Sequence, residues 1–237
     1  MHTLKKVTTA FVLGAGLGTR LRPYTESIPK PLLPLRGKPL ICHAFDQLLS
    51  AGIQRFIVNT HHCAERYDEA FPDSHYRDIP IIFRFEPVLL ETAGGLKNIE
   101  DLLDPEEPLL VYNGDILSDL PLQSLLEQHH TQASEVTLAL RTGGEPRNVT
   151  LGKDGTIRDF RQTLLPDQPG NTLYTGIGIF EYAHFKRLTA GKKESLVPVW
   201  IEMIRQGCPP CGVIIDQGTW NDIGTVDIYE KLNCTDS

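Results

Sequence analysis

Short apolar runs alternate with amphipathic stretches along the first 133 residues of the chain. The apolar runs predict buried strands, which lie at residues 7–13, 53–60, 79–85 and 109–112. The amphipathic stretches predict helices, which lie at residues 39–50, 63–71, 94–103 and 120–131. Since a helix follows each strand, the pattern predicts a mostly parallel sheet with helices on both faces.

The pattern changes after residue 134, where strands follow one another more closely. The predicted strands are 136–141, 149–151, 157–160, 173–180 and 212–216, and the predicted helices are 182–189, 196–206 and 226–232. Asp154-Gly155 is typical of the turn of a hairpin. Because no linker or repeat divides the chain, we predict one α/β domain over residues 1–237, with a Rossmann-like, mixed but mostly parallel sheet.

The composition narrows the range of partners. The chain has 237 residues, 41% hydrophobic residues and a formal net charge of −7, which supports a buried core and disfavours nucleic acid or an anionic membrane as a partner. The N-terminus, MHTLKKV, lacks the apolar core of a signal peptide, and no run of about 18 apolar residues is present. Five cysteines in a chain of this size fit reduced thiols in the cytoplasm.

A glycine-rich loop follows the first predicted strand. Residues 14–19 read GAGLGT, and closely spaced glycines after a strand place bare backbone amides where a ligand approaches. Arg20 and Arg22 follow at once, and Lys30 comes after a proline-containing segment. Backbone donors and fixed cations in one short stretch predict an anion site, and more narrowly a polyphosphate site.

Two well-known phosphate loops do not match this stretch. A Walker A loop ends in Gly-Lys followed by Ser or Thr, whereas Gly18 is followed by Thr19 and Arg20. The dinucleotide fingerprint requires a third glycine where Thr19 stands, and an acidic residue where the second strand ends in Asn59-Thr60. The remaining alternative is a plain turn, but such turns rarely carry two arginines and a spaced lysine.

Two aspartates are candidates for a metal site. Asp115 follows the strand at 109–112, and Asp222 precedes the last predicted helix. Because ligands of open α/β sheets bind beyond the carboxyl ends of the strands, we expect Asp115 on the same rim as the glycine-rich loop. One or two carboxylates beside phosphates are typical of a Mg²⁺ site. Each aspartate alone is also compatible with an ordinary turn or helix N-terminus.

Five segments together resemble the sugar-1-phosphate nucleotidylyltransferases, also called NDP-sugar pyrophosphorylases. They are LGAGLGTRLRPYTESIPKPLLPLRGKPLI at 13–41, EPVLLETAGGL at 86–96, VYNGDI at 111–116, YTGIGIFE at 174–181 and WNDIGT at 220–225. The chain stops soon after the last segment, so it resembles the short members, such as N-acetylmuramate-1-phosphate uridylyltransferases and mannose- or heptose-1-phosphate guanylyltransferases. The resemblance implies a Mg²⁺-dependent enzyme that makes an NDP-sugar, a precursor of cell-wall or surface polysaccharide, from a nucleoside triphosphate and a sugar-1-phosphate.

The resemblance also implies roles for individual residues. The catalytic set is Arg20 at the leaving phosphates, Lys30 at the α-phosphate, and Asp115 and Asp222 at Mg²⁺. The nucleotide-binding residues are Leu13, Gly14, Ala15, Gly16, Gly18, Thr19, Thr92, Gly94 and Asn113, and the sugar-binding residues are Thr175 and Gly176. Residues 1–133 would form a nucleotide-binding half and residues 134–237 a sugar-binding half.

Two positions depart from the family pattern. Many relatives carry a Glu-Lys-Pro segment after the mid-chain hairpin, whereas this chain reads FRQTLLP at 160–166. Either Arg161 substitutes for the lysine, or the sugar phosphate relies on Lys30 and the metal. Glu91 stands where a glycine usually precedes Thr-Ala-Gly, which resembles the muramate uridylyltransferases.

Cys208 and Cys211 have metal-ligand spacing, but with no nearby partners we interpret this segment as a proline-stiffened loop.

Two other functions stay open from the sequence. One is a cytidylyltransferase that acts on phosphocholine, for which aromatic residues around the choline are expected. The other is a non-catalytic regulatory subunit that binds a nucleotide or an NDP-sugar. The base, the sugar and self-association into a homo-oligomer are not fixed by these motifs.

Overall fold

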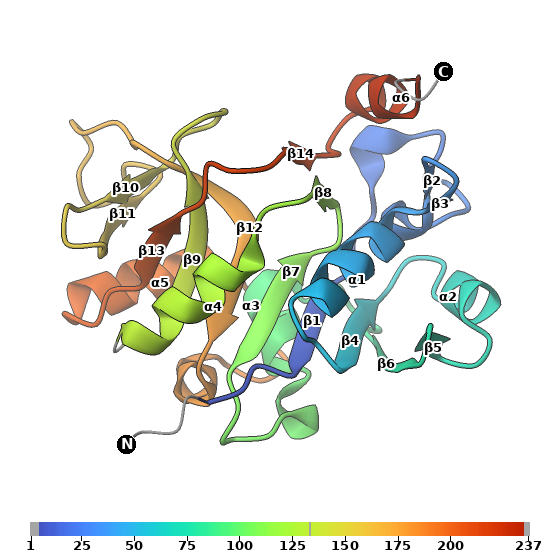
Figure 1. Ribbon diagram of the computed structural model, residues 1–237, viewed down its shortest axis with the longest axis horizontal. Helices are drawn as coiled ribbons and strands as arrows, with labels where there is room; N and C mark the ends of the chain where they lie inside the picture. Colours follow the sequence, from blue (N-terminus) through green and yellow to red (C-terminus); the bar gives the residue numbers. More distant parts are fainter. Residues whose placement is uncertain (1–4, 133, 235–237) are drawn as a thin grey trace.

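An eight-stranded sheet runs through the protein in the order β13-β9-β12-β7-β1-β4-β6-β5 (Figure 1). The computed structural model describes residues 5–132 and 134–234. The strands of the sheet are β1 Thr9–Leu13, β4 Arg55–Thr60, β5 His75–Tyr76, β6 Ile79–Phe85, β7 Leu109–Asn113, β9 Val136–Arg141, β12 Leu173–Phe180 and β13 Cys211–Ile214.

The sheet is mixed and mostly parallel, which confirms the predicted fold class. Strands β7, β1, β4 and β6 are parallel neighbours, and β13 is parallel to β9. Strand β12 is antiparallel to both β7 and β9. The reason is that a hairpin rather than a helix connects β9 to β12, so the chain returns without the crossover that a parallel strand needs.

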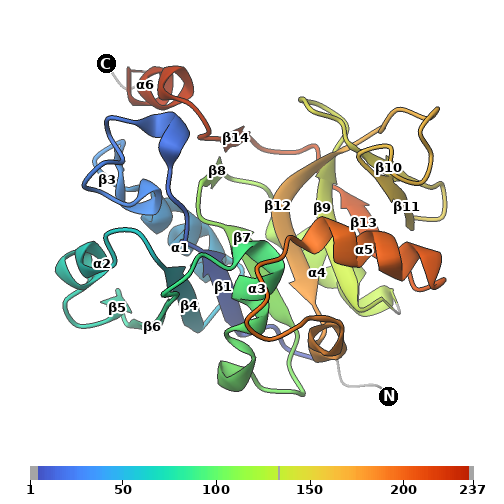
Figure 2. The ribbon, with the colours of Figure 1, turned by 180° about the vertical axis from the view of Figure 1, so that it is seen from behind.

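Helices cover both faces of the sheet, as predicted. They are α1 Leu40–Ser50, α2 Glu65–Ala70, α3 Glu91–Lys97, α4 Leu122–Thr131, α5 Leu196–Arg205 and α6 Val226–Cys234. Helices α1 and α4 lie on the face seen in Figure 1, and α3 and α5 lie on the face seen in Figure 2. None of the helices in the described part of the chain combines the length and apolar character that crossing a bilayer requires.

Strand β1 shows why its sequence is apolar at successive positions. Val12 packs in the cluster that contains Phe45 of α1, whereas Phe11 packs in the cluster that contains Leu96 of α3 and Trp200 of α5. Successive side chains of a strand point to opposite faces. A central strand covered by helices on both sides is therefore apolar over most of its length.

Three short ribbons complete the fold. They pair β2 Pro34–Leu35 with β3 Lys38–Pro39, β10 Val149–Leu151 with β11 Ile157–Phe160, and β8 Ile116–Ser118 with β14 Trp220–Asp222. Only the β10–β11 hairpin was predicted. Strands of two or three residues show no hydrophobic period, and the partners β8 and β14 are far apart in the sequence.

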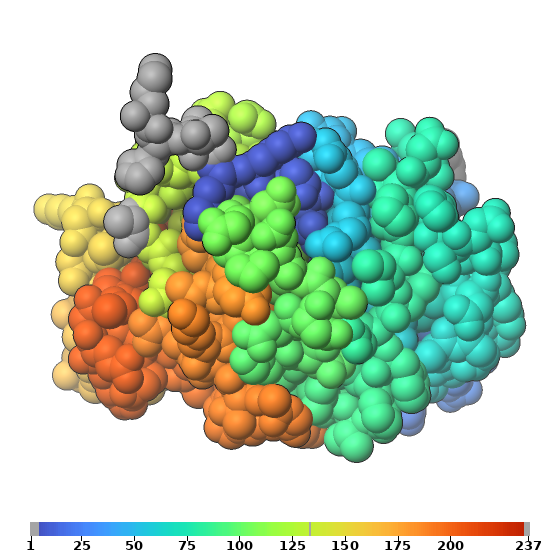
Figure 3. Space-filling view, turned by 90° about the horizontal axis from the view of Figure 1, so that it is seen from below, coloured from blue at the N-terminus to red at the C-terminus, as the bar shows by residue number. Residues whose placement is uncertain are grey.

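Two predicted helices differ from the structure. The segment predicted as a helix at 94–103 contains α3, which starts earlier at Glu91, and a separate 3-10 helix at Glu100–Leu102. The segment predicted at 182–189 is a 3-10 helix at Tyr182–Arg187. It lies at the end of the molecule opposite the β8–β14 ribbon, beside the loop before β7 and the start of β1 (Figure 3).

His184 in this 3-10 helix predicts how stability depends on pH. The side chain is fully buried, and neither ring nitrogen has a hydrogen-bond partner within the described residues. Burial lowers the pKa of His184 from 6.5 to about 4. Because the unfolded chain binds a proton first, stability is lost as the pH falls from 6.5 toward 4.

We expect His184→Phe to reduce this loss by about 2 kcal/mol between pH 7 and pH 5. Urea unfolding at the two pH values measures it. The matched control is His75→Phe, because His75 is exposed. Equal losses in wild type and His184→Phe would contradict the prediction.

Candidate active site

The glycine-rich loop follows Leu13, the last residue of β1. Only some of its backbone amides are free to bind a ligand. A Cβ on Gly14 would lie 2.7 Å from the carbonyl oxygen of Asn59, so the position requires glycine. The amides of Gly14 and Ala15 donate to Asn59 Oδ1 at 2.8 and 3.3 Å. The expectation of bare amides is therefore wrong for these two residues. The amides of residues 16–18 make no hydrogen bond with any described residue, and they remain available to an anion.

Two 3-10 helices place the predicted cations. Arg20 lies in the helix Thr19–Leu21, and Lys30 begins the helix Lys30–Leu32. Lys30 Nζ donates to Asp115 Oδ2 at 2.7 Å, and the lysine side chain is largely buried. The guanidinium of Arg20 lies against Gly224, where a Cβ would be 3.3 Å from Nη1. A glycine after Asp222 thus leaves room for the arginine.

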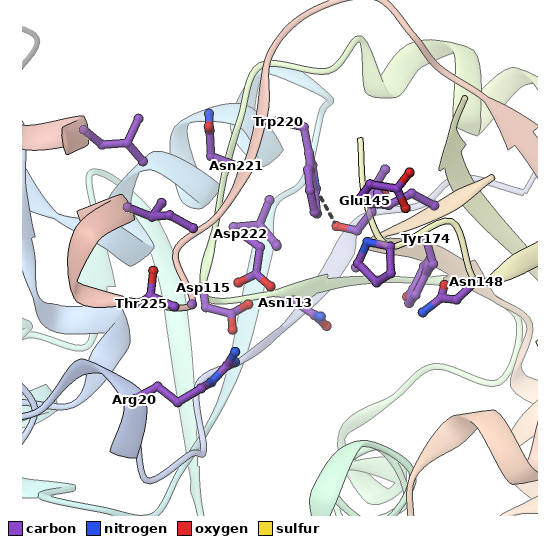
Figure 4. Close-up of a pocket in the computed structure, with 18 of the residues that line it drawn as sticks. Arg20, Asn113, Asp115, Glu145, Asn148, Tyr174, Trp220, Asn221, Asp222 and Thr225 are labelled. Carbon is purple, nitrogen blue, oxygen red and sulfur yellow. Dashed lines mark hydrogen bonds between the residues drawn. The ribbon is translucent and has the colours of Figure 1, made fainter. Parts of the chain in front are cut away.

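The β8–β14 ribbon brings the two predicted aspartates together. Asp115 precedes β8, Asp222 is the last residue of β14, and the amide of Ile223 donates to the carbonyl of Asp115 at 3.0 Å. Figure 4 shows both carboxylates and the guanidinium of Arg20 pointing toward one another. The structure therefore brings Arg20, Lys30, Asp115 and Asp222 to one place.

The electrostatics of Asp222 fit a divalent cation. Burial and the neighbouring carboxylate of Asp115 raise the pKa of Asp222, whereas Lys30 and Arg20 act in the opposite direction. Its Oδ1 atom is buried and accepts no hydrogen bond from any described residue. An unsatisfied buried carboxylate oxygen beside a second carboxylate is a suitable ligand set for Mg²⁺. Within residues 5–132 and 134–234, no group of three or more His, Cys, Asp or Glu side chains could hold a metal.

Two cavities meet at this cluster. The first cavity, of about 380 Å³, is lined by the glycine-rich loop, Lys30, Asn59, Glu91 and Thr92. The second cavity, of about 550 Å³, is lined by residues from β12, β14, α6 and the loops around β10–β11. Asn113 and Asp115 line both. Groups bound in the two cavities would therefore meet beside the carboxylates.

An irregularity in β12 shapes the second cavity. The register between β12 and β9 shifts between Tyr174 and Gly178, which frees part of the strand from the ladder. Gly176 has φ +81°, and a Cβ there would lie 2.7 Å from Asn113 Nδ2. Trp220 Nε1 donates to the carbonyl of Thr175 at 2.8 Å (Figure 4). Both predicted sugar-binding residues, Thr175 and Gly176, line this cavity.

The predicted nucleotide-binding residues divide into two groups. Most of them line the first cavity: Leu13, Gly14, Ala15, Gly16, Gly18, Thr92 and Asn113. Thr19 and Gly94 line neither cavity. A Cβ on Gly94 would lie 2.3 Å from the carbonyl oxygen of Lys192, so close packing against that loop accounts for this glycine. Thr92 Oγ1 also accepts from the amide of Leu196 at 3.0 Å.

The two departures from the family pattern have clear locations. Glu91 begins α3 with φ +59°, a backbone conformation that glycine adopts without strain. This explains why a glycine is usual at that position. Arg161 also has a positive φ, +57°, and it lines the second cavity.

Two other residues named in the sequence analysis lie away from the cluster. Arg22 lines neither cavity. Cys211 is the first residue of β13, directly after the proline-containing loop.

Sequence reasoning missed three residues beside the first cavity. Asn59 and Ser195 line it, and Glu86 is buried behind it. In the sequence, Asn59 stands where the dinucleotide fingerprint would place an acidic residue. The available signal was a polar residue at the carboxyl end of a buried parallel strand, where ligands bind. Ser195 carried no such signal, because its loop follows no strand of the sheet.

Comparisons with known proteins find nucleotidyl transferases. The nucleotidyl transferase family model matches residues 9–237. An N-acetylmuramate alpha-1-phosphate uridylyltransferase from Neisseria meningitidis is 33% identical over 226 residues, which cover 92% of this chain and 93% of that protein. A mannose-1-phosphate guanylyltransferase from Mycobacterium tuberculosis is 32% identical over 227 residues. That match covers 94% of this chain, but the chain spans only 62% of the mycobacterial protein's length.

The fold also matches solved structures. A UDP-glucose pyrophosphorylase from Acinetobacter baumannii superposes with a TM-score of 0.78 at 16% identity, and the match covers 96% of this chain and 92% of that one. At this identity the likeness concerns the fold alone. The match of the family model over nearly the whole chain shows that the protein belongs to the nucleotidyl transferase family.

Proposed function

We propose that the protein is a sugar-1-phosphate nucleotidylyltransferase, which joins a nucleoside triphosphate to a sugar-1-phosphate and releases pyrophosphate. The observation that carries the proposal is the cluster of Asp115, Asp222, Lys30 and Arg20 at the junction of two cavities. Each of the two cavities would bind one of the two substrates. The first contains the glycine-rich loop and would bind the nucleotide, and the second would bind the sugar phosphate.

The proposed reaction is an in-line displacement at the α-phosphorus. A phosphate oxygen of the sugar-1-phosphate forms a bond to the α-phosphorus, the bond from that phosphorus to the bridging oxygen breaks, and pyrophosphate leaves with the electron pair. A phosphate nucleophile is ionised at neutral pH, so the reaction needs no general base. Positioning and charge stabilisation supply most of the acceleration in such transfers.

The residues at the junction match these needs. Arg20 and the free amides of residues 16–18 would bind the phosphates that leave, and Lys30 would bind the α-phosphate. Asp115 and Asp222 would hold Mg²⁺, which when bound offsets the charge of the phosphate groups. With only two carboxylates available among the described residues, phosphate oxygens and water would complete the coordination.

The substrates follow from the relatives only as a proposal. The uridylyltransferase of Neisseria meningitidis matches over nearly the whole of both chains, which supports UTP and N-acetylmuramate α-1-phosphate as the first pair to test. The mycobacterial guanylyltransferase supports GTP and mannose-1-phosphate as the second. We place the reaction in the cytoplasm, in line with the five cysteines, all of which are unpaired.

The test is pyrophosphate release with Mg²⁺ present. Each of UTP, GTP, CTP and dTTP is combined with N-acetylmuramate-1-phosphate, mannose-1-phosphate, glucose-1-phosphate and phosphocholine. We expect turnover with a sugar-1-phosphate. Turnover with phosphocholine alone would replace the proposal by the cytidylyltransferase alternative, and silence across the panel would reject an enzymatic function.

A further inference from the structure

A buried chain of hydrogen bonds joins the two walls of the first cavity. On one side, the amides of Gly14 and Ala15 donate to Asn59 Oδ1 at 2.8 and 3.3 Å. The side-chain nitrogen of the same residue, Asn59 Nδ2, donates to Glu86 Oε1 at 2.7 Å. The second oxygen, Glu86 Oε2, accepts from the amide of Leu90 at 3.0 Å. The chain therefore runs from the glycine-rich loop to the segment that carries Glu91 and Thr92.

Both side chains of this connection are withdrawn from water. Asn59 is 1% exposed and Glu86 is 0% exposed. A buried carboxylate is costly unless each oxygen is satisfied, and here each oxygen accepts one N–H group. Gly95 leaves the space for this contact, because a Cβ there would lie 2.9 Å from both Asn59 Nδ2 and Glu86 Oε1. The glycine is therefore explained by the buried pair and not by a ligand.

The connection fixes both walls at defined points. At the glycine-rich loop it occupies the first two amides, whereas those of residues 16–18 make no hydrogen bond with any described residue. At the opposite wall it holds the amide of Leu90, whose carbonyl accepts from the amide of Glu194 at 3.0 Å. Leu90 is thus held from two sides immediately before Glu91, which has φ +59°. Loss of the pair would release this conformation and the loop together.

We propose that Asn59 and Glu86 are positioning residues for the nucleoside triphosphate. Neither needs to touch the reacting atoms, since Asn59 holds the loop that would bind the phosphates and Glu86 holds the opposite wall through Leu90. The proposal rests on the proposed function, because it assigns the nucleotide to the first cavity. It predicts an effect on nucleotide affinity and little effect on the affinity for the sugar-1-phosphate.

The order of donors and acceptors along the pair provides a sharp test. In Glu86→Gln, the new side-chain NH₂ group must face either the backbone N–H of Leu90 or the side-chain NH₂ group of Asn59. Two donors then face each other, so one hydrogen bond is lost in every rotamer. In Asn59→Asp, two buried carboxylates face each other. In the double variant, the new carboxylate at position 59 accepts from the loop amides and from the new side-chain NH₂ group at position 86. The side-chain carbonyl at position 86 then accepts from Leu90, so the exchange restores every contact with the same net charge.

We expect each single variant to raise the Kd for Mg²⁺–UTP and Mg²⁺–GTP, measured by calorimetry, and the KM for the active nucleotide by about 10-fold or more, the effect of one lost hydrogen bond to a buried charged group. The KM for the sugar-1-phosphate should change by less than about 2-fold, within the error of additivity. The double variant should bind nucleotide nearly as tightly as wild type. All measurements are made where circular dichroism shows each variant to be folded.

Thr137→Val is the matched control. Thr137 is fully buried, and its hydroxyl lies 2.8 Å from Nδ1 of His129, away from both cavities. This variant should lower the melting temperature without changing the Kd for either nucleotide. Single variants at Asn59 and Glu86 that lose stability but keep the nucleotide Kd would overturn the proposal, as would a double variant that binds no better than the singles. A wild-type protein that binds none of UTP, GTP, CTP and dTTP would instead reject the proposed function.

Discussion

Replacing Lys30 by methionine is expected to lower kcat/KM by about 10²–10³-fold, the usual cost of removing one preorganised charge-stabilising group. Lys30 is largely buried, and its ammonium lies 2.7 Å from Asp115 Oδ2, at the junction of the two cavities. No other lysine lines the first cavity among the described residues. Methionine keeps the length of the side chain and removes the charge. Steady-state kinetics of pyrophosphate release measure the effect.

Lys38→Met is the control for this prediction. Lys38 also forms an ion pair, with Asp46, but it lines neither the first nor the second cavity. Its loss should leave kcat/KM within about twofold of wild type, because partly exposed ion pairs contribute little. If Lys30→Met and Lys38→Met are equally active, the lysine at position 30 has no role in the reaction. If wild type itself binds nucleotide but never turns over, the regulatory-subunit alternative is favoured.

Asp222→Asn is expected to stabilise the protein and to abolish most of its activity. Burial and Asp115 raise the pKa of Asp222, so the folded protein favours the protonated form more than the unfolded chain does. At neutral pH the ionised carboxylate therefore reduces the free energy of unfolding, and asparagine removes this cost. The gain should be largest at neutral pH and should shrink as the pH falls toward the raised pKa.

The same substitution removes a proposed Mg²⁺ ligand. We expect turnover to fall by more than about 100-fold, beyond the cost of losing a residue that only supports a ligand. Urea unfolding without Mg²⁺ and kinetics with Mg²⁺ measure the two effects. Asp227→Asn, at an exposed position in the first turn of α6, is the control and should change neither by much. If Asp222→Asn is destabilised at neutral pH, or is fully active, the result contradicts the prediction.

The regular part of the fold follows directly from the sequence pattern. Helix α1 and strands β4, β6 and β7 are each long enough to show a hydrophobic period, and all of them were predicted. The start of α3 was not, because Glu91 enters the helix from a left-handed backbone conformation that its residue type does not signal. Local propensity cannot reveal a conformation that tertiary contacts impose.

The candidate site was predicted for two different reasons. The glycine-rich loop and Asp115 follow buried strands, and the rule that ligands bind beyond the carboxyl ends of strands is sufficient to place them. The partnership of Asp115 with Asp222 was predicted from the preference of Mg²⁺ for carboxylates and from the family resemblance, since no periodic pattern predicts the pairing of β8 with β14. Asn59 and Glu86 were missed because their importance lies in the order of donors and acceptors, which only coordinates reveal.

The β8–β14 ribbon has a consequence for how the protein is made. A ribosome releases residue 222 long after the glycine-rich loop and Asp115 have left the exit tunnel. Since the pairing of residues 116–118 with residues 220–222 brings the two carboxylates together, a growing or prematurely terminated chain lacks the pair of carboxylates proposed to hold Mg²⁺. Under the proposed function, a chain that ends before residue 220 would carry the glycine-rich loop without the pair of carboxylates that turnover requires.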